Sequence, residues 1–286
     1  MAGIINYTCN ATGRLIMTIT IDSESCTRCG TCTEVCPMGI IDAAGEEKLP
    51  LIQEERSGMC MSCGQCEAFC PSGAIVQEDG RNGQTKASAE GAIPADRLGL
   101  YLKSRRSIRH YRPDPVPKDT IVSILDIARF AASGGNGQPV EWLVIHDSKE
   151  VQRVAGLTVD WMRELARSNH PMSAYAPHLI TAWERGNDII CHRSPHLIIP
   201  HIPETNPLAS TDAIIALTHV DIAAPAFGVG TCWAGFVAAA SCSYQPLQDM
   251  LDLPKGRVPA YAMMFGYPRH KPHYLPRRKS LNVTWK

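Results

Sequence analysis

CTRCGTCTEVCPMGII at residues 26–41 and CMSCGQCEAFCPSGAI at residues 60–75 are two copies of one pattern. Each copy reads C-x-x-C-x-x-C-x-x-x-C-P, and a glycine, Gly30 or Gly64, follows its second cysteine. Three cysteines at this spacing wrap a tight loop around three corners of a cubic metal cluster, whereas the fourth points away toward another cluster. The glycines allow the backbone to approach a cluster closely and to adopt positive φ angles. The repeat therefore predicts a domain built around two clusters.

The doubled pattern resembles that of the bacterial ferredoxins that carry two 4Fe–4S clusters. The resemblance implies crossed ligation, in which each motif gives three cysteines to one cluster and its fourth cysteine to the other. One cluster is assigned to Cys26, Cys29, Cys32 and Cys70, and the other to Cys60, Cys63, Cys66 and Cys36. Zinc is the alternative metal, but structural zinc sites use two C-x-x-C pairs that lie about a dozen or more residues apart.

The flanks of the repeat set the extent of this domain. The stretches MTITID before the first motif and IVQ after the second are typical of short strands. We therefore place a ferredoxin-like domain at residues 18–80, after an N-terminal extension at residues 1–17. EDGRNGQTKASAEGAIPAD, which ends at Asp96, has the composition of a linker. The linker is placed at residues 81–96 and a second domain at residues 97–286.

Composition and charge exclude several classes of protein. Lys plus Arg and Asp plus Glu both number 28, and no basic tract indicates a nucleic-acid partner. The longest apolar stretch, residues 213–230, is interrupted by His219 and Asp221, whereas a membrane-spanning helix needs about 20 mostly apolar residues. The N-terminal residues lack the pattern of a secretory signal. Twelve cysteines in a reducing compartment indicate metal binding. We expect a cytoplasmic protein with no nucleic-acid or membrane partner.

The second domain mixes helices and strands without a regular βαβ alternation, which favours an α+β fold. A helix capped by Asp119 is predicted from apolar positions such as Ile121, Leu125 and Ala128, and Asp147-Ser148 is predicted to cap another. The remaining expected elements are a loop at 133–137, strands at 140–145, 196–202 and 260–265, a helix at 149–157, and a long buried helix at 211–227.

Four motifs in this domain resemble the nitroreductase family of FMN proteins. They are SRRSIRHYRPDPVP at 104–117, ASGGNGQPVEWLVIHD at 132–147, GVGTCWAGF at 228–236 and FGYP at 265–268, in the order the family has them. The resemblance covers residues 97–286. It implies an α+β domain that binds FMN and forms a homodimer, with each flavin site built from both chains at the subunit interface.

The resemblance also implies which residues hold the flavin phosphate. Arg105, Arg106, Ser107 and Arg109 offer cationic forks and a hydroxyl to phosphate and ribityl oxygens. The C-terminal Arg277 and Lys279 match the second phosphate clamp of the family. The alternative interpretation is that the arginine run is merely solvated, as most charge runs are.

Further matches fall along the flavin ring. In the glycine-rich loop they are Ser133, Asn136 and Gln138. In the later segment they are Cys232, Trp233, Ala234 and Gly235. The backbone N–H groups of this later segment would face the flavin N5 and O4 edge. Turn chemistry alone is an alternative reason for the loop residues. Cys232 is interpreted as a packed thiol in preference to a nucleophile. Two departures from the family are Ala234, where relatives often carry Glu, and QPVEW in place of QPW.

Residues 158–195 lie where the family places its variable cover over the flavin. Trp161, Tyr175 and Trp183 are either core residues or substrate-stacking groups, with the core favoured for each. His178, His192 and Tyr175 are candidate proton donors, although solvent can also supply the proton.

Together the two resemblances imply an oxidoreductase that passes electrons from two 4Fe–4S clusters to FMN, which delivers a pair to a small electron-poor substrate of nitroaromatic, enone or quinone type. The fused ferredoxin module favours a low-potential donor of ferredoxin or flavodoxin type. The sequence contains no G-x-G-x-x-G fingerprint, which is the pattern that would indicate a separate nicotinamide-binding domain. The alternative function is a non-catalytic electron-transfer flavoprotein.

Overall fold

A computed structural model describes residues 4–9, 17–42, 48–78, 92–206 and 208–286. The chain divides into two compact units, Met1–Gly91 with Gly135–Gly137, and Ala92–Gly134 with Gln138–Lys286. Most of the expected linker, residues 81–91, lies outside the described residues. Among the described residues, no helix has the length and apolar character needed to cross a membrane.

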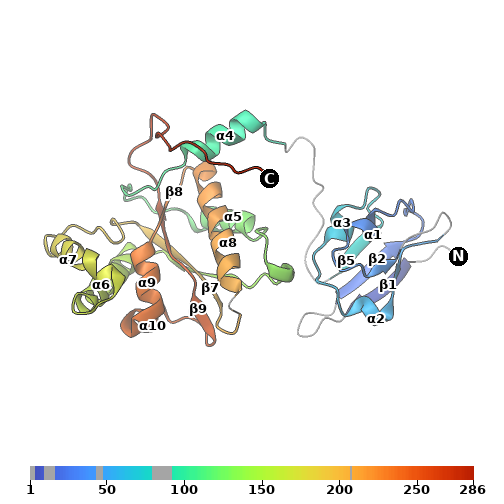
Figure 1. Cartoon of the computed structure of the whole chain (residues 1–286), viewed down its shortest axis with the longest axis horizontal. Helices are drawn as coiled ribbons and strands as arrows, with labels where there is room; N and C mark the ends of the chain where they lie inside the picture. The colour runs from blue at the N-terminus through green and yellow to red at the C-terminus, as the bar shows by residue number, and fades with distance from the viewer. Residues whose placement is uncertain (1–3, 10–16, 43–47, 79–91, 207) are drawn as a thin grey trace. The chain divides into compact units, whose positions relative to one another are not determined.

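The first unit contains two small antiparallel sheets (Figure 1). One has the strand order β1-β2-β5, from β1 (Ile4–Cys9), β2 (Met17–Asp22) and β5 (Ile75–Glu78), and the other pairs β3 (Ile41–Asp42) with β4 (Leu51–Ile52). The strands predicted in MTITID and IVQ are confirmed. The sequence did not predict β1, which pairs with β2 from Ile4 opposite Asp22 to Cys9 opposite Met17.

The internal repeat is visible in the backbone of this unit. Its helices are α1 (Thr31–Val35), α2 (Glu54–Ser57) and α3 (Gln65–Ala68), and Gly30 and Gly64 precede α1 and α3 with φ angles of 76° and 74°. The same left-handed conformation recurs at the equivalent pairs Arg28 and Ser62, and Gly39 and Gly73. The positive φ angles expected at Gly30 and Gly64 are therefore confirmed, and both motifs follow the same path.

The second unit is built on a five-stranded antiparallel sheet (Figure 1). The strands are β6 (Glu141–Ile145), β7 (His196–Pro203), β8 (Gly230–Trp233), β9 (Arg257–Pro259) and β10 (Met263–Gly266). Their order is β6-β7-β10-β8, and β9 also pairs with β7. Strand β7 is the long buried centre of the sheet, which its run of apolar residues predicts.

Helices cover both faces of this sheet (Figure 1). Ile198 of β7 packs with α5 (Lys118–Ala128) and α8 (Ala209–Ala223). Its neighbours Leu197 and Ile199 point the other way, because successive side chains of a strand alternate between faces. That second face is covered by α6 (Ser148–Leu165), α7 (Ala176–Glu184), α9 (Gly235–Ser243) and α10 (Gln245–Leu251). Helix α4 (Ala95–Ser104) opens the unit, and the α+β class is confirmed.

Several predicted boundaries need correction. Asp119 does not cap α5, because the helix begins one residue earlier and its N-cap is Pro117, which has no side-chain hydrogen bond to give. The prediction for α6 is correct at its start, where the Asp147 carboxylate accepts from the Lys149 N–H at 2.8 Å, but the helix runs on to Leu165. The long helix ends at Ala223 and continues as a 3-10 turn, Ala224–Phe227. The last strand begins at Met263, three residues later than predicted.

Candidate functional site

Two hollows in the first unit are each surrounded by four cysteines. One, of about 320 Å³, is lined by Cys36, Cys60, Cys63 and Cys66. The other, of about 300 Å³, is lined by Cys26, Cys29, Cys32 and Cys70. Each hollow thus combines three cysteines of one motif with the fourth cysteine of the other. In each motif a short helix follows Gly30 or Gly64, and the fourth cysteine comes after that helix. These are the two groups that crossed ligation requires.

The surroundings of the cysteines fit a thiolate-bound cluster. Apolar side chains of Ile19, Ile40 and Ile41 line the first hollow, and such a shell keeps water from a cluster. Burial raises the pKa of Cys66 to about 11, although the Gln77 amide donates to its Sγ at 3.2 Å and opposes the rise. Iron must therefore displace a proton from this thiol on binding. In the described parts of the chain, no group of three or more His, Cys, Asp or Glu side chains is placed to hold a single metal ion.

The second hollow has a more polar rim. Hydrogen bonding to the Thr31 hydroxyl, which lies 3.3 Å from the sulfur, lowers the pKa of Cys29. At Cys70 burial raises the pKa, but hydrogen bonds from Ser72 and nearby backbone groups outweigh it, and the net pKa is lowered. Hydroxyl and amide donors at cluster sulfurs are among the features that set a cluster's reduction potential. The two hollows therefore offer different environments.

In the second unit, the segment after α4 runs beside strand β8. The Ile108 N–H donates to the Thr231 carbonyl at 2.8 Å, and the Arg112 N–H donates to the Tyr267 carbonyl at 2.8 Å. The approach is close, because a Cβ atom added to Gly230 would lie 2.5 Å from Cγ1 of Ile108. This contact places the first nitroreductase-like motif directly against the third.

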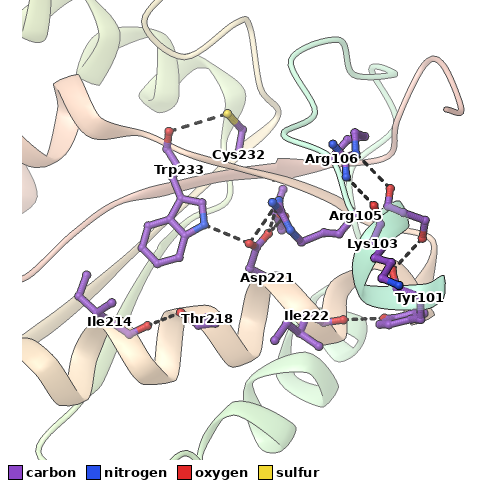
Figure 2. Close-up of polar contacts among 12 residues, drawn as sticks. Tyr101, Lys103, Arg105, Arg106, Ile214, Thr218, Asp221, Ile222, Cys232 and Trp233 are labelled. Atoms are coloured by element: carbon purple, nitrogen blue, oxygen red, sulfur yellow. Dashed lines mark hydrogen bonds and ion pairs between the residues drawn. The ribbon is translucent and has the colours of Figure 1, made fainter. Parts of the chain in front are cut away.

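A buried carboxylate, Asp221, links these two segments (Figure 2). It projects from the last turn of α8, and its side chain is only 7% exposed. Arg105 Nη1 lies 3.4 Å from its Oδ2, the Trp233 indole Nε1–H donates to Oδ2 at 3.0 Å, and the Thr231 hydroxyl donates to Oδ1. Sequence reasoning noted Asp221 only as an interruption of an apolar stretch, and no local pattern connects it to Arg105.

The other arginines near Arg105 have separate partners. Arg106 turns back to the end of α4, where its Nη2 donates to the Lys103 carbonyl at 2.5 Å and its Nε to the Ser104 carbonyl at 3.4 Å (Figure 2). Desolvation and the nearby charges of Arg278 and Arg105 lower the pKa of Arg106. The charge of Arg278, in the C-terminal segment, thus acts on Arg106, although the two residues lie at opposite ends of the domain. Arg277 and Lys279 belong to the same exposed C-terminal segment as Arg278.

Ser107 and Arg109 lie near the Cys232 thiol. Burial raises the pKa of Cys232, whereas the charge of Arg109 and a hydrogen bond with Ser107 oppose the rise. The residue is 2% exposed and packs in the core below the sheet, which is the environment expected for a packed thiol. The next residue but one, Ala234, is also buried, and its N–H donates to the Ala262 carbonyl at 2.9 Å. The Ala234 N–H is therefore not available to a flavin. The N–H groups in the first turn of α9, which begins at Gly235, have no acceptor within the helix.

The glycine-rich loop is strained. Gly135, Asn136 and Gln138 all have positive φ angles, of 53°, 53° and 44°, which non-glycine residues rarely adopt. Ser133 Oγ accepts from the Gln138 N–H at 3.0 Å, and the buried Asp212 accepts from the Gly134 N–H at 3.0 Å. Ser133 and Gln138 line a hollow of about 470 Å³ in the second unit.

Comparison with known proteins identifies both parts of the chain. Residues 25–75 match the sequence model of the 4Fe-4S dicluster domain, and residues 102–267, more than half of the chain, match that of the nitroreductase family. The chain belongs to the nitroreductase family. A relative, the FMN reductase [NAD(P)H] of Bacillus subtilis, is 28% identical over 180 residues, which are 62% of this chain and 68% of the relative.

Solved structures show the same fold for the nitroreductase domain. A nitroreductase with bound FMN from Bacteroides fragilis is 20% identical, with a TM-score of 0.52, over 65% of this chain and 95% of that one. A nitroreductase with bound FMN from Desulfitobacterium hafniense is 19% identical, with a TM-score of 0.53, over 66% of this chain and 98% of that one. These likenesses support the order of helices and strands described above.

Residues 158–195, the expected cover over the flavin, contain both buried and exposed side chains. Trp161 is 5% exposed, and Trp183 packs against Gly156 of α6, so both belong to the core. Tyr175 is 58% exposed and its ring makes an edge contact with Phe236 at 5.9 Å. Of the candidate proton donors, His178 is exposed, whereas burial lowers the pKa of His192.

Proposed function

We propose that this chain is an iron–sulfur flavoprotein oxidoreductase with two 4Fe–4S clusters and one FMN per chain. Its substrate is a small electron-poor molecule of nitroaromatic, enone or quinone type, and its electrons come from a low-potential donor of ferredoxin or flavodoxin type. The observation that carries the proposal is the pair of four-cysteine hollows in a chain whose other unit has the nitroreductase fold. The FMN bound by relatives of that fold supports the choice of flavin.

When bound, the clusters would supply single electrons and the flavin would collect a pair for the substrate. The chain's own residues do the holding and orienting. The cysteines of each hollow would hold the iron as thiolates, and the apolar walls would keep water from the cluster. The charges of Arg105 and Arg278 act on Arg106, and a group of cations from the two ends of the domain suits a phosphate of nearly two negative charges. The unused N–H groups at the start of α9 suit the edge of the flavin ring that gains charge on reduction.

We also propose that the nitroreductase domain forms a homodimer with the flavin at the subunit interface. Large apolar side chains on α4, α5 and the residues after them are exposed in the single chain, among them Leu100 at 61%, Val122 at 63% and Phe130 at 74%. Exposed apolar groups of this size are typical of a surface that is covered in the assembly.

The experiment that tests the electron route is Cys36→Ala in the holoprotein. Cys36 lies in the first motif but lines the second motif's hollow, so its loss should perturb the cluster held by Cys60, Cys63 and Cys66. FMN content and substrate reduction by chemically reduced protein should stay near wild type, whereas the ferredoxin-driven rate should fall sharply. Cys242→Ala, an exposed cysteine of the nitroreductase domain, is the matched control and should change neither rate. An undiminished ferredoxin-driven rate in Cys36→Ala would show that electrons bypass this cluster.

A further inference from the structure

Asp221 receives donors from both segments of the nitroreductase domain that are assigned to the flavin. Arg105 comes from the phosphate segment, and Thr231 and Trp233 come from the strand that leads to the flavin ring edge (Figure 2). We propose that Asp221 is a positioning residue, which fixes Arg105 against β8 in the orientation that binds the flavin phosphate. This inference rests on the proposed binding of FMN and deepens it.

The burial of Asp221 requires an explanation. A carboxylate in an apolar stretch of a core helix is costly unless it is paired and hydrogen-bonded, and an apolar residue there is the ordinary choice. Its neighbours Val220 and Ala223 face the apolar core between α5 and α8. The Asp221 carboxylate accepts from a guanidinium, an indole and a hydroxyl, and all three donors come from segments outside α8. Asp221 therefore adds a buried polar link among α8, the segment of Arg105 and β8.

The geometry of the ion pair leaves the rest of the guanidinium fork for other acceptors. Both contacts of Arg105 with the carboxylate are made by Nη1, at 3.4 Å to Oδ2 and 3.5 Å to Oδ1. The guanidinium is planar, so holding Nη1 restricts where Nε and Nη2 can lie and leaves both for another acceptor. Arg105 is 30% exposed, in contrast to Asp221, so the side chain extends from a buried anchor toward the surface. A side chain held in this way loses less entropy when it binds phosphate.

Asp221 also offsets repulsion among the cations of the clamp. The nearby charges of Arg278 and Arg105 disfavour the charged form of Arg106, so the three guanidinium groups repel one another before any phosphate binds. A carboxylate at 3.4 Å from Arg105 reduces that repulsion in the flavin-free protein.

The test is the affinity of FMN and of riboflavin, which lacks the phosphate, for Asp221→Asn in the full chain. The asparagine oxygen, in the place of Oδ2, still accepts from the Trp233 indole. The negative charge is lost and an NH₂ group takes the place of Oδ1, so the hold on Arg105 is weakened. We expect FMN affinity to fall about fivefold and riboflavin affinity to change less than about twofold. In an Arg105→Ala background, Asp221→Asn should have no further effect on FMN affinity.

Two controls separate a positioning role from a merely structural one. Asp221→Glu keeps the charge but moves it by one methylene, so FMN affinity should fall by a smaller factor; this variant decides the matter if Asp221→Asn does not fold. Thr231→Val removes one donor but leaves the ion pair, and its FMN-to-riboflavin preference should match wild type. The inference is overturned if Asp221→Asn and Asp221→Glu both retain the wild-type preference, or if Asp221→Asn weakens FMN equally with and without Arg105. If Arg105→Ala itself leaves the preference unchanged, the phosphate clamp of the proposed function fails instead.

Discussion

His196 makes the stability of the nitroreductase domain depend on pH. The ring is fully buried at the start of β7, where its Nε2 accepts from the Val116 N–H at 2.8 Å and its Nδ1–H donates to the His146 carbonyl at 2.9 Å. The His146 ring stacks on it at 4.3 Å. Both ring nitrogens are therefore used by the neutral form, and a proton on Nε2 would face the Val116 N–H.

Burial lowers the pKa of His196 to about 4, although the hydrogen bond to the His146 carbonyl opposes the fall. In the unfolded chain the pKa is about 6.5. Between these values the unfolded state binds more protons, so the free energy of unfolding falls as the pH falls from about 6.5 to about 4. At about 1.4 kcal/mol for each pKa unit, the full loss is about 3 kcal/mol. By pH 5 about 2 kcal/mol of it should be gone.

The assay is urea unfolding followed by tryptophan fluorescence, at pH values from 7 to 5. All five tryptophans lie after residue 97, so the signal reports the nitroreductase domain alone. Wild type should lose about 2 kcal/mol more over this range than His196→Gln, which keeps an acceptor for Val116 but does not titrate. The exposed His178→Gln is the matched control and should follow wild type. Parallel curves for wild type and His196→Gln would refute the assignment of the pH dependence to this ring.

Alanine substitutions at two constrained glycines, Gly230 and Gly64, and at a control glycine, Gly99, give further expected outcomes. Gly230→Ala would place a Cβ 2.5 Å from Ile108 Cγ1 and 2.9 Å from Pro268 Cγ, so unfolding free energy should fall by about 1–3 kcal/mol, measured by the same urea assay. Gly64→Ala puts a side chain at a φ of 74°, which costs about 1–2 kcal/mol, and should reduce the iron retained after gel filtration. Gly99→Ala in α4, where the nearest atom is 4.0 Å away, should leave stability and iron content unchanged or slightly improved. A wild-type iron content in Gly64→Ala would argue against a strained turn at the cluster.

The features that the sequence predicted best depend on local spacing. The cysteine motifs, the left-handed Gly30 and Gly64, and the Asp147 cap each involve residues within a few positions of one another, and local spacing determines their geometry. Strand β7 was predicted at residues 196–202 from its apolar centre and lies at His196–Pro203. The grouping of Cys36 and Cys70 with the opposite motifs followed from the resemblance to ferredoxins.

The features that the sequence missed depend on partners far along the chain. Asp221 lies 116 positions from Arg105, so its pairing is a property of the fold and not of any motif. Strand β1 exists through its pairing with β2, and pairing is not encoded within a strand's own residues. Asp119 was wrongly predicted as a cap because the helix-starting proline, Pro117, can itself occupy the N-cap position without a side-chain bond.

The most direct test of the central claim is analysis of iron, acid-labile sulfide and flavin in one anaerobically purified and reconstituted sample. Two four-cysteine hollows and one nitroreductase domain predict about eight iron, about eight sulfide and about one FMN per chain, with no stoichiometric zinc. Stoichiometric zinc, or no more than about four iron after full reconstitution, would contradict the account of two clusters.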